Sequence, residues 1–285
     1  MAVIGALIIS YNPDIEKLIK NISAIESQVN KTIVVDNGSS NQEYVLSLMD
    51  SRETVEVVCC EENEGIAAAL NKGMQHFWNT GFDWVLTLDQ DSTCPPNLIT
   101  VLSNHVDNPE LGIACPDINY GNGKWVSKFG NKPIYIQACM TSASLTRVEA
   151  WHNVNGYDES YFIDFVDNDF CMKLRLHGYK VLRDFNAVLQ HQLGNTKDII
   201  LFGKHIKYSE HSPLRTYYMV RNNAFFIRKY RANLNVFREL MRLVYIICNV
   251  LCFSKDRISH IRSIKKAFLD YSHFRMGKYT GNICR

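Results

Sequence analysis

The chain has 285 residues, and 46% of them are hydrophobic, so it can build one large or two small domains with a full core. Disorder as the main state is therefore excluded. The net charge is only +2, yet residues 204–285 hold 17 basic and 4 acidic residues, which leaves 14 basic and 25 acidic residues in residues 1–203. The sequence thus predicts an acidic body over residues 1–203 and a basic extension over residues 204–285.

Nine cysteines, an odd number, are scattered without CxxC pairs, and we interpret them as free thiols in a reducing compartment. The apolar N-terminus lacks the basic region and the cleavage site of a signal peptide. The longest apolar run, residues 243–253, would rise about 16 Å as a helix, roughly half the thickness of a bilayer core. We therefore expect a cytoplasmic protein without a membrane-spanning segment.

Residues 3–92 alternate short β-branched runs with amphipathic segments. These patterns predict strands over residues 3–10, 31–36, 55–60 and 84–89, and helices over residues 14–27, 42–51 and 65–80. The series favours an α/β fold with a mostly parallel, buried central sheet. From Pro95 to about Gly194 the periodicity is less regular, and it includes a predicted strand over residues 187–191, but no linker separates this part from the first. From Pro213 onward the chain is predicted to be helical.

Polar turns follow the first four predicted strands, at the sheet edge where parallel α/β proteins bind ligands. No GxGxxG or GxxxxGK[ST] motif is present, so neither an ordinary dinucleotide site nor a P-loop is predicted. The charge of a diphosphate would then require a divalent cation held by carboxylates. Asp89 and Asp91 alternate at a strand end and can project to the same side. A DxD triplet also arises by chance, but its place after an apolar strand favours a metal site.

Five motifs occur in one order over about residues 3–195: ALIISYN, IVVDNGSSN, ENEGIAAALNKGM, WVLTLDQDS and GYDESYFIDFVDNDFCMKLRLHGY. This order resembles family 2 of the inverting glycosyltransferases, which have the GT-A fold. The resemblance implies a Rossmann-like catalytic domain over residues 1–203, flanked by helices on a mostly parallel sheet. Its nucleotide-binding half would span about residues 1–92 and its acceptor-binding half about residues 93–203, followed by the basic helical extension.

The resemblance also implies residues that bind a nucleotide sugar. Asp36 would accept a hydrogen bond from N3–H of a thymine or uracil base, although an Asx turn alone is the alternative. Mg²⁺ or Mn²⁺ would bind Asp91 and bridge the two phosphates. His191 would approach the metal or the diphosphate, with a packing histidine as the alternative. The other predicted nucleotide-sugar ligands are Ser10, Tyr11, Asn12, Asn63, Gly65, Asp89 and Gln90.

An acidic cluster near residue 164 is the candidate catalytic region. Inversion needs one carboxylate that takes the proton of the acceptor hydroxyl. The family motif implies that this base is Asp167 at the start of a helix, with Asp164 as the rival. Many members have Glu before the base, and this chain has Val166, which departs from the pattern. Carboxylates at a helix start are also stabilised by the helix dipole without any catalytic role.

Residues 212–223, SPLRTYYMVRNN, resemble an element that follows the catalytic domain of bacterial rhamnosyltransferases acting on polysaccharide precursors. The same group carries a pattern like FIDFVD at residues 162–167. The resemblance implies transfer of L-rhamnose from dTDP-rhamnose. Arg215, Tyr218 and Arg221 are three residues apart, so we expect them near one helix face. The two arginines would clamp a diphosphate, either that of the donor or that of a lipid-diphosphate acceptor. An amphipathic packing helix is the alternative.

Apolar residues recur at helical spacing in the extension and are surrounded by Lys and Arg; they are Val236, Leu240, Leu243, Val244, Ile247 and Leu251. This composition is typical of a helix in a bilayer interface. We therefore predict a peripheral protein at the inner face of the cytoplasmic membrane, with a saccharide acceptor that is linked to a lipid diphosphate. A helical subdomain that packs on the body or on a second subunit is the alternative, and the sequence does not set the oligomeric state.

The predicted function is an inverting, metal-dependent rhamnosyltransferase of bacterial cell-surface polysaccharide (O-antigen) biosynthesis. A family 2 enzyme with a UDP-sugar donor is the alternative. A sugar-nucleotide pyrophosphorylase would need a glycine-rich loop after the first strand, where this chain has Ser-Tyr-Asn-Pro. A membrane or nucleic-acid binding module is the non-enzyme alternative, and we expect no nucleic-acid partner because the aromatic residues of the extension lie mostly in apolar runs.

Overall fold

The structure is a computed structural model that describes residues 2–47, 52–119, 130–190, 196–201 and 204–281. The chain divides into two compact units. The first unit comprises Met1–Glu159 and Val166–Gln192, and the second comprises Ser160–Phe165 and Leu193–Arg285. The short segment Ser160–Phe165 therefore packs with the C-terminal helices, although both of its neighbours in sequence belong to the first unit. The domain boundary between residues 203 and 204 stays a prediction.

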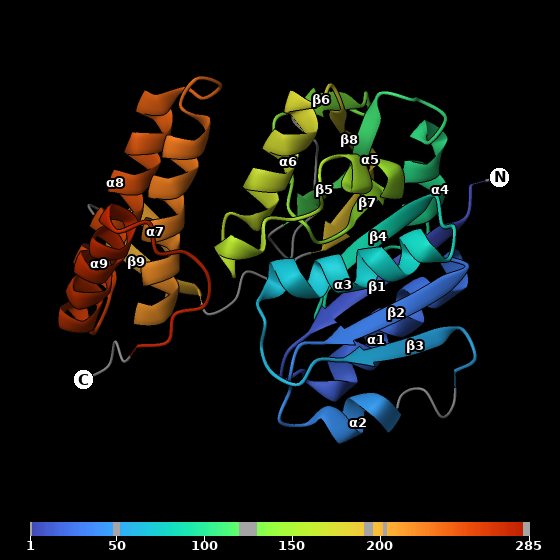
Figure 1. The fold of residues 1–285 in the computed structure, drawn as a ribbon, viewed down its shortest axis with the longest axis horizontal. Coiled ribbons are helices and arrows are strands. Elements are labelled where there is room, and N and C mark those ends of the chain that lie inside the picture. The colour runs from blue at the N-terminus through green and yellow to red at the C-terminus, as the bar shows by residue number, and fades with distance from the viewer. Residues whose placement is uncertain (1, 48–51, 120–129, 191–195, 202–203, 282–285) are drawn as a thin grey trace. The chain divides into compact units, whose positions relative to one another are not determined.

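An eight-stranded sheet forms the centre of the first unit within the described residues, in the order β3-β2-β1-β4-β7-β5-β8-β6 (Figure 1). β1 (Ile4–Ser10) pairs in parallel with both β2 (Lys31–Asp36) and β4 (Trp84–Asp89). β2 pairs in parallel with β3 (Val55–Cys59). These four strands fall where the β-branched runs predict them, and their carboxyl ends share one edge of the sheet.

The other half of the sheet is mixed. β7 (Ser144–Arg147) runs antiparallel between β4 and β5 (Leu111–Asn119). β8 (Lys180–Gln190) is parallel to β5, and β6 (Ile134–Ile136) pairs antiparallel with β8. The antiparallel β7 matters for the site because it lies directly beside β4.

The helices of the first unit are α1 (Ile15–Ile25), α2 (Gln42–Leu46), α3 (Ile66–Asn79), α4 (Leu98–Leu102), α5 (Val148–Asn153) and α6 (Val166–Leu176). Asp14 caps α1 by accepting hydrogen bonds from the backbone N–H groups of Glu16 and Lys17, as expected for a carboxylate at a helix start. The apolar stripe of α1 joins the sheet core through Leu18 and Ile22. The helix predicted over residues 42–51 is described only to Leu46, since residues 48–51 lie outside the described ranges.

The second unit contains the hairpin β9 (Thr196–Leu201) and β10 (Lys204–Ser209), followed by α7 (Pro213–Tyr230), α8 (Val236–Phe253) and α9 (Arg257–Ser272). Ser212 caps α7 by accepting from the N–H of Arg215, and Pro213 occupies its first turn. The three helices pack around an apolar centre made of Tyr217, Tyr218, Val220, Leu243, Ile246 and Ala267. The predicted helical extension is therefore confirmed.

The expectation that Arg215, Tyr218 and Arg221 share one helix face is wrong. The Arg215 side chain is 50% exposed, whereas Tyr218 and Arg221 are buried. Each step of three residues turns an α-helix by about 300°, so six residues leave the two arginines about 120° apart. Only the first arginine faces outward.

α8 is apolar on two faces. Leu243, Ile246 and Val250 are buried within the second unit. A second set of large side chains is exposed, and we call it the outer face of α8: Phe237, Leu240, Met241, Val244 and Tyr245. Among the described helices none is long and apolar enough to cross a bilayer.

Asn71 on α3 ties the loop after α5 to the body of the first unit. Its amide nitrogen donates to the carbonyl of Tyr157 (2.9 Å) and to Glu159 (2.8 Å), and its oxygen accepts from the N–H of Tyr157 (2.8 Å) and from the Trp151 indole (3.1 Å). Gly156 has φ +60, and a Cβ at this position would lie 2.6 Å from the Asn71 oxygen. The close approach therefore requires both residues.

Asn71→Ala should lower the free energy of unfolding by about 1–3 kcal/mol, because the backbone groups of Tyr157 lose their partners. Urea denaturation, followed by tryptophan fluorescence, measures this change in the free energy of unfolding. Gln75→Ala, at an exposed position of the same helix, should change stability by no more than about 0.5 kcal/mol. Equal effects of the two substitutions would contradict this role of Asn71.

Candidate active site at the strand ends

The turns after β1, β2 and β4 hydrogen-bond to one another. The N–H of Tyr11 donates to the side-chain oxygen of Gln90 (2.7 Å), which joins the β1 turn to the end of β4. The N–H of Asn12 donates to Ser39 (2.7 Å), and the Asn12 side-chain oxygen accepts from the N–H of Ser40 (2.8 Å). The structure thus brings these predicted ligands together at one edge, while their contacts with a nucleotide stay predictions.

Asp36 closes β2 and is fully buried. Its carboxylate accepts hydrogen bonds from the hydroxyls of Ser10 (3.2 Å) and Ser39, from the N–H of Ser39 (3.0 Å) and from the Gln42 amide (3.2 Å). Four donors fill the acceptor sites of an ionised carboxylate. A thymine or uracil ring that donates its N3–H to Asp36 would therefore have to replace one of these four hydrogen-bond donors.

Asn37 and Asn63 join the β2 turn to the turn between β3 and α3. The Asn37 amide donates to the Asn63 oxygen (3.2 Å), which also accepts from the N–H of Gly65 (3.0 Å). Gly38 lies at φ +76, and a Cβ there would lie 2.4 Å from the carbonyl carbon of Glu62. Only glycine allows the two turns to pack this closely.

The segment 139–144 packs against the end of β4. The Thr87 hydroxyl donates to the carbonyl of Thr141 (2.6 Å), and the N–H of Asp89 donates to the Ser142 hydroxyl (3.2 Å). The hydroxyls of Ser92 and Ser142 lie 2.6 Å apart. This segment therefore holds both ends of the turn that carries Asp89, Gln90 and Asp91.

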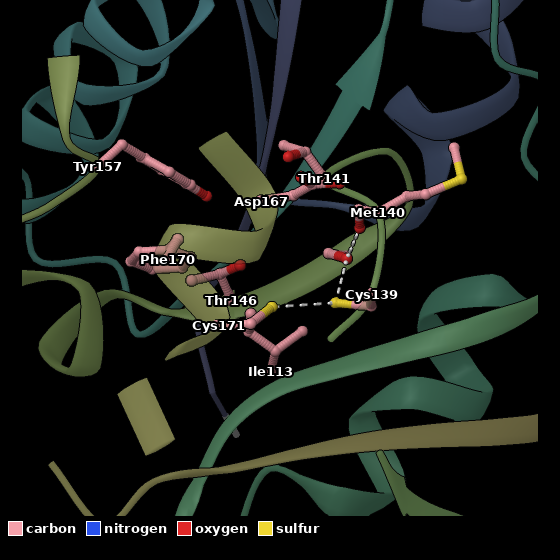
Figure 2. Close-up of a pocket in the computed structure, with 10 residues that line it drawn as sticks. Ile113, Cys139, Met140, Thr141, Thr146, Tyr157, Asp167, Phe170 and Cys171 are labelled. Carbon is pink, nitrogen blue, oxygen red and sulfur yellow. Dashed lines mark hydrogen bonds between the residues drawn. The ribbon is translucent and has the colours of Figure 1, made fainter. Parts of the chain in front are cut away.

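The other side of the same segment lines a small pocket that contains Asp167 (Figure 2). Thr141, Tyr157 and Asp167 lie at one end of the pocket, and Ile113 and two cysteines lie at the other. Asp167 is in the first turn of α6 and accepts from the N–H of Asn168 (2.8 Å). The positive end of the helix favours the ionised carboxylate. The strand ends and Asp167 are thus connected through residues 139–144.

Tyr157 is a buried phenol in this pocket. Burial, with the neighbouring Cys171 and Cys139, raises the pKa of Tyr157 far above its ordinary value, so its phenol stays protonated. The sulfur atoms of Cys139 and Cys171 lie 3.9 Å apart as thiols. Every cysteine in the described ranges is free, as predicted, and Cys284 lies outside them.

The acidic residues after β4 fit a divalent cation that also binds a diphosphate. Asp91 is exposed and Asp89 is half-buried at the strand-end edge. Within the described ranges no three His, Cys, Asp or Glu side chains are close enough to form a metal site by themselves. Mg²⁺ at phosphate sites is commonly held by one or two carboxylates together with the phosphates, so these residues suit it. His191, the other predicted metal ligand, lies outside the described residues.

The second unit contains Asp164 and Arg215. The Arg215 guanidinium pairs with the Asp164 carboxylate (3.2 Å), whose side chain is 15% exposed. Burial and the Arg215 charge lower the pKa of the nearby His211. Asp164 thus has an ion-pair partner within its own unit, which an acceptor hydroxyl approaching the same oxygen would have to displace.

Arg221 is 1% exposed. Its guanidinium donates to the Tyr217 hydroxyl (3.0 Å), the Gly277 carbonyl (2.9 Å) and the Asn222 oxygen (3.0 Å). These contacts account for a buried arginine inside the second unit. Its predicted contact with a diphosphate stays a prediction.

Three residues of this region were not predicted from the sequence: Thr141, Ser142 and Tyr157. Thr141 and Ser142 lie in a stretch of small residues whose composition is visible, but their contacts with β4 depend on the antiparallel pairing of β7. Tyr157 looks like an ordinary aromatic residue next to glycine. Its place in the pocket depends on Asn71, which is 86 residues away in sequence.

The chain is similar to proteins of a known family. Residues 6–173 match the family described as Glycosyl transferase family 2. The dTDP-rhamnosyl transferase RfbF of Shigella flexneri is 28% identical over 284 residues, which cover 94% of each chain. A hyaluronan synthase of Streptococcus pyogenes is 28% identical over 127 residues, covering 42% of this chain and 30% of that protein.

Solved structures show the same fold. S. aureus TarS 1–349 in complex with UDP-GlcNAc matches with a TM-score of 0.58 at 16% identity, over 96% of this chain and 81% of that one. GalNAc-T7 with UDP, GalNAc and Mn²⁺ matches with a TM-score of 0.64 at 13% identity, over 95% of this chain and 55% of that one. The predicted GT-A fold class with a helical C-terminal region is confirmed. Since the family match spans more than half of the chain, the protein belongs to glycosyl transferase family 2.

Proposed function

We propose that the protein transfers L-rhamnose from dTDP-rhamnose to a lipid-linked saccharide, with inversion at the anomeric carbon, in the biosynthesis of a bacterial cell-surface polysaccharide. The observation that supports this donor is the similarity to a dTDP-rhamnosyl transferase along 94% of both chains. That similarity extends through the second unit, whereas the hyaluronan synthase similarity covers 42% of this chain.

A UDP-sugar donor is the second candidate. The matching structures of TarS and GalNAc-T7 contain UDP-GlcNAc and UDP respectively. Thymine and uracil present the same N3–H donor, so a contact with Asp36 does not distinguish the two bases. Turnover assays with both nucleotide sugars separate the two candidates.

The proposed reaction is a single displacement. Asp167 takes the proton of the acceptor hydroxyl, whose oxygen forms a bond to C1 of the sugar while the bond from C1 to the dTDP oxygen breaks. The acceptor attacks the face opposite the leaving dTDP, so the configuration inverts without a covalent enzyme intermediate. Thr141 lines the same small pocket as Asp167, so we propose its hydroxyl as a hydrogen-bond partner of the acceptor hydroxyl.

The remaining predicted ligands bind the donor. Ser10, Tyr11, Asn12, Asn63, Gly65 and Gln90 would surround the nucleoside, and Arg215 would pair with a phosphate. Asp91, with Asp89 beside it, would hold Mg²⁺ or Mn²⁺. A bound cation neutralises the charge that develops on the departing diphosphate.

The outer face of α8 supports attachment to an anionic membrane surface, where a lipid-linked acceptor is found. Phe237 is 73% and Tyr245 is 67% exposed. Exposed basic residues occur on both α8 and α9, namely Arg238, Arg242, Arg257, Arg262 and Lys265, whereas Glu239 and Asp270 are buried and Asp256 is an exposed acidic residue. Each basic residue near an anionic leaflet contributes about 1 kcal/mol. A second copy of this chain is disfavoured as the partner of the outer face of α8, because a twofold interface there would bring like charges together.

Asp167→Asn should lower kcat by about 10²–10⁴-fold, because the amide cannot accept the acceptor proton. The affinity for dTDP should change by less than about threefold, since the substitution removes no donor contact. Steady-state kinetics and dTDP titration measure the two quantities. Asp107→Asn, at an exposed carboxylate outside the site, serves as the control. Wild-type turnover in Asp167→Asn together with its loss in Asp164→Asn would assign the base to Asp164.

The double variant Phe237→Glu/Tyr245→Glu should lose most of its co-sedimentation with vesicles of phosphatidylglycerol and phosphatidylcholine. The wild type should bind these vesicles more strongly than vesicles of phosphatidylcholine alone. Tyr44→Glu is the matched control, because Tyr44 is 66% exposed on the first unit. Absence of wild-type binding, or a dimer that the double variant abolishes, would contradict membrane attachment through α8.

A further inference from the structure

The segment Ser160–Phe165 contains three residues in the left-handed backbone region: Phe162 (φ 58), Asp164 (φ 62) and Phe165 (φ 69). This region is uncommon for residues with a Cβ, and two of these residues carry bulky aromatic rings. Such strain persists only where the surroundings hold it, and it occurs preferentially at functional sites. The contacts that stabilise this strained backbone therefore indicate which residues the segment depends on.

Asn222 on α7 holds the backbone of this segment. Its amide nitrogen donates to the carbonyls of Tyr161 (2.8 Å), Ile163 (2.8 Å) and Asp164 (3.0 Å). Its oxygen accepts from Arg221 (3.0 Å), and the side chain is fully buried. One side-chain amide thus donates to three backbone carbonyls of the segment that contains the left-handed residues. Neither an aspartate nor an aliphatic residue of this size supplies the two N–H donors.

Side chains of the second unit hold the rings of the segment. Phe162 stacks on Tyr218, with ring centroids 5.3 Å apart. Phe165 packs beside Phe226 at 5.6 Å, and the Arg242 guanidinium lies 4.6 Å from its ring centre. α7 and α8 therefore fix both the backbone and the rings.

The segment leads directly into the candidate catalytic residues. It contains Asp164, and Phe165 is bonded to Val166, the first residue of α6, whose first turn contains Asp167. A backbone shift between Tyr161 and Asp164 therefore changes the geometry of the chain that enters α6. Misplacement of a reacting group by about 1 Å can lower a rate about 100-fold.

We infer that Asn222 is a positioning residue for sugar transfer: its amide holds the strained segment Ser160–Phe165 in the conformation from which the chain enters α6, the helix whose first turn contains Asp167. This inference rests on the proposed function. It gives the second unit a part in turnover besides membrane attachment, because the contacts of Asn222 come from α7 and not from the outer face of α8.

Asn222→Ala should lower kcat about 10- to 100-fold, with the KM for dTDP-rhamnose within about twofold of wild type. Asn223→Ala is the matched control, since Asn223 is the next residue, is equally buried, and makes no side-chain hydrogen bond with the described part of the chain. It should keep kcat within about threefold. Asn222→Asp, which keeps the shape and the acceptor for Arg221 but removes both N–H donors, should behave like Asn222→Ala.

Amide hydrogen exchange of the full-length variants provides the second readout. Residues 160–165 should exchange faster in Asn222→Ala than in Asn223→Ala, while β2 keeps its wild-type protection. Unchanged exchange in residues 160–165, or equal kcat losses in the two alanine variants, would overturn the inference. Hydrogen exchange needs no substrate. If the wild type does not turn over dTDP-rhamnose, the proposed donor is wrong, but the exchange measurement still tests whether Asn222 stabilises residues 160–165.

Discussion

Parallel pairing of β1 with both β2 and β4 is the constraint on which the candidate site depends. It brings the carboxyl ends of separate strands to one edge, where the turn side chains satisfy one another's polar groups. Asp36 is buried at this edge because Ser10, Ser39 and Gln42 supply its hydrogen bonds. The site is therefore part of the sheet architecture and not an addition to its surface.

The antiparallel β7 extends this arrangement toward Asp167. Because it pairs with β4, the preceding residues Thr141 and Ser142 contact the end of the strand that carries Asp89, and the same segment lines the pocket of Asp167. One short segment thus connects the candidate donor site to the candidate base. Asn71 completes the connection from the other side by holding the loop that contains Tyr157.

Local patterns predicted the four parallel strands, the helix after Asp14 and the helical extension, because each depends on periodicity within a short stretch of sequence. Contacts between distant parts of the sequence were not predictable. The partners of Asn222 lie 58–61 residues away and are backbone carbonyls, which leave no mark on composition. The burial of Arg221 was likewise not predictable, because a buried arginine and an exposed one look the same in the sequence, and its partners Tyr217 and Gly277 are known only from the structure.

Calorimetric titration with dTDP and with UDP, each with and without Mn²⁺, tests the central claim most directly when wild type and Asp91→Ala are compared. The account predicts Mn²⁺-dependent binding of dTDP that is tighter than binding of UDP and is weakened in the variant. Tighter binding of UDP would contradict the rhamnose donor. Absence of binding by either nucleotide would contradict the assignment of the strand ends as the donor site.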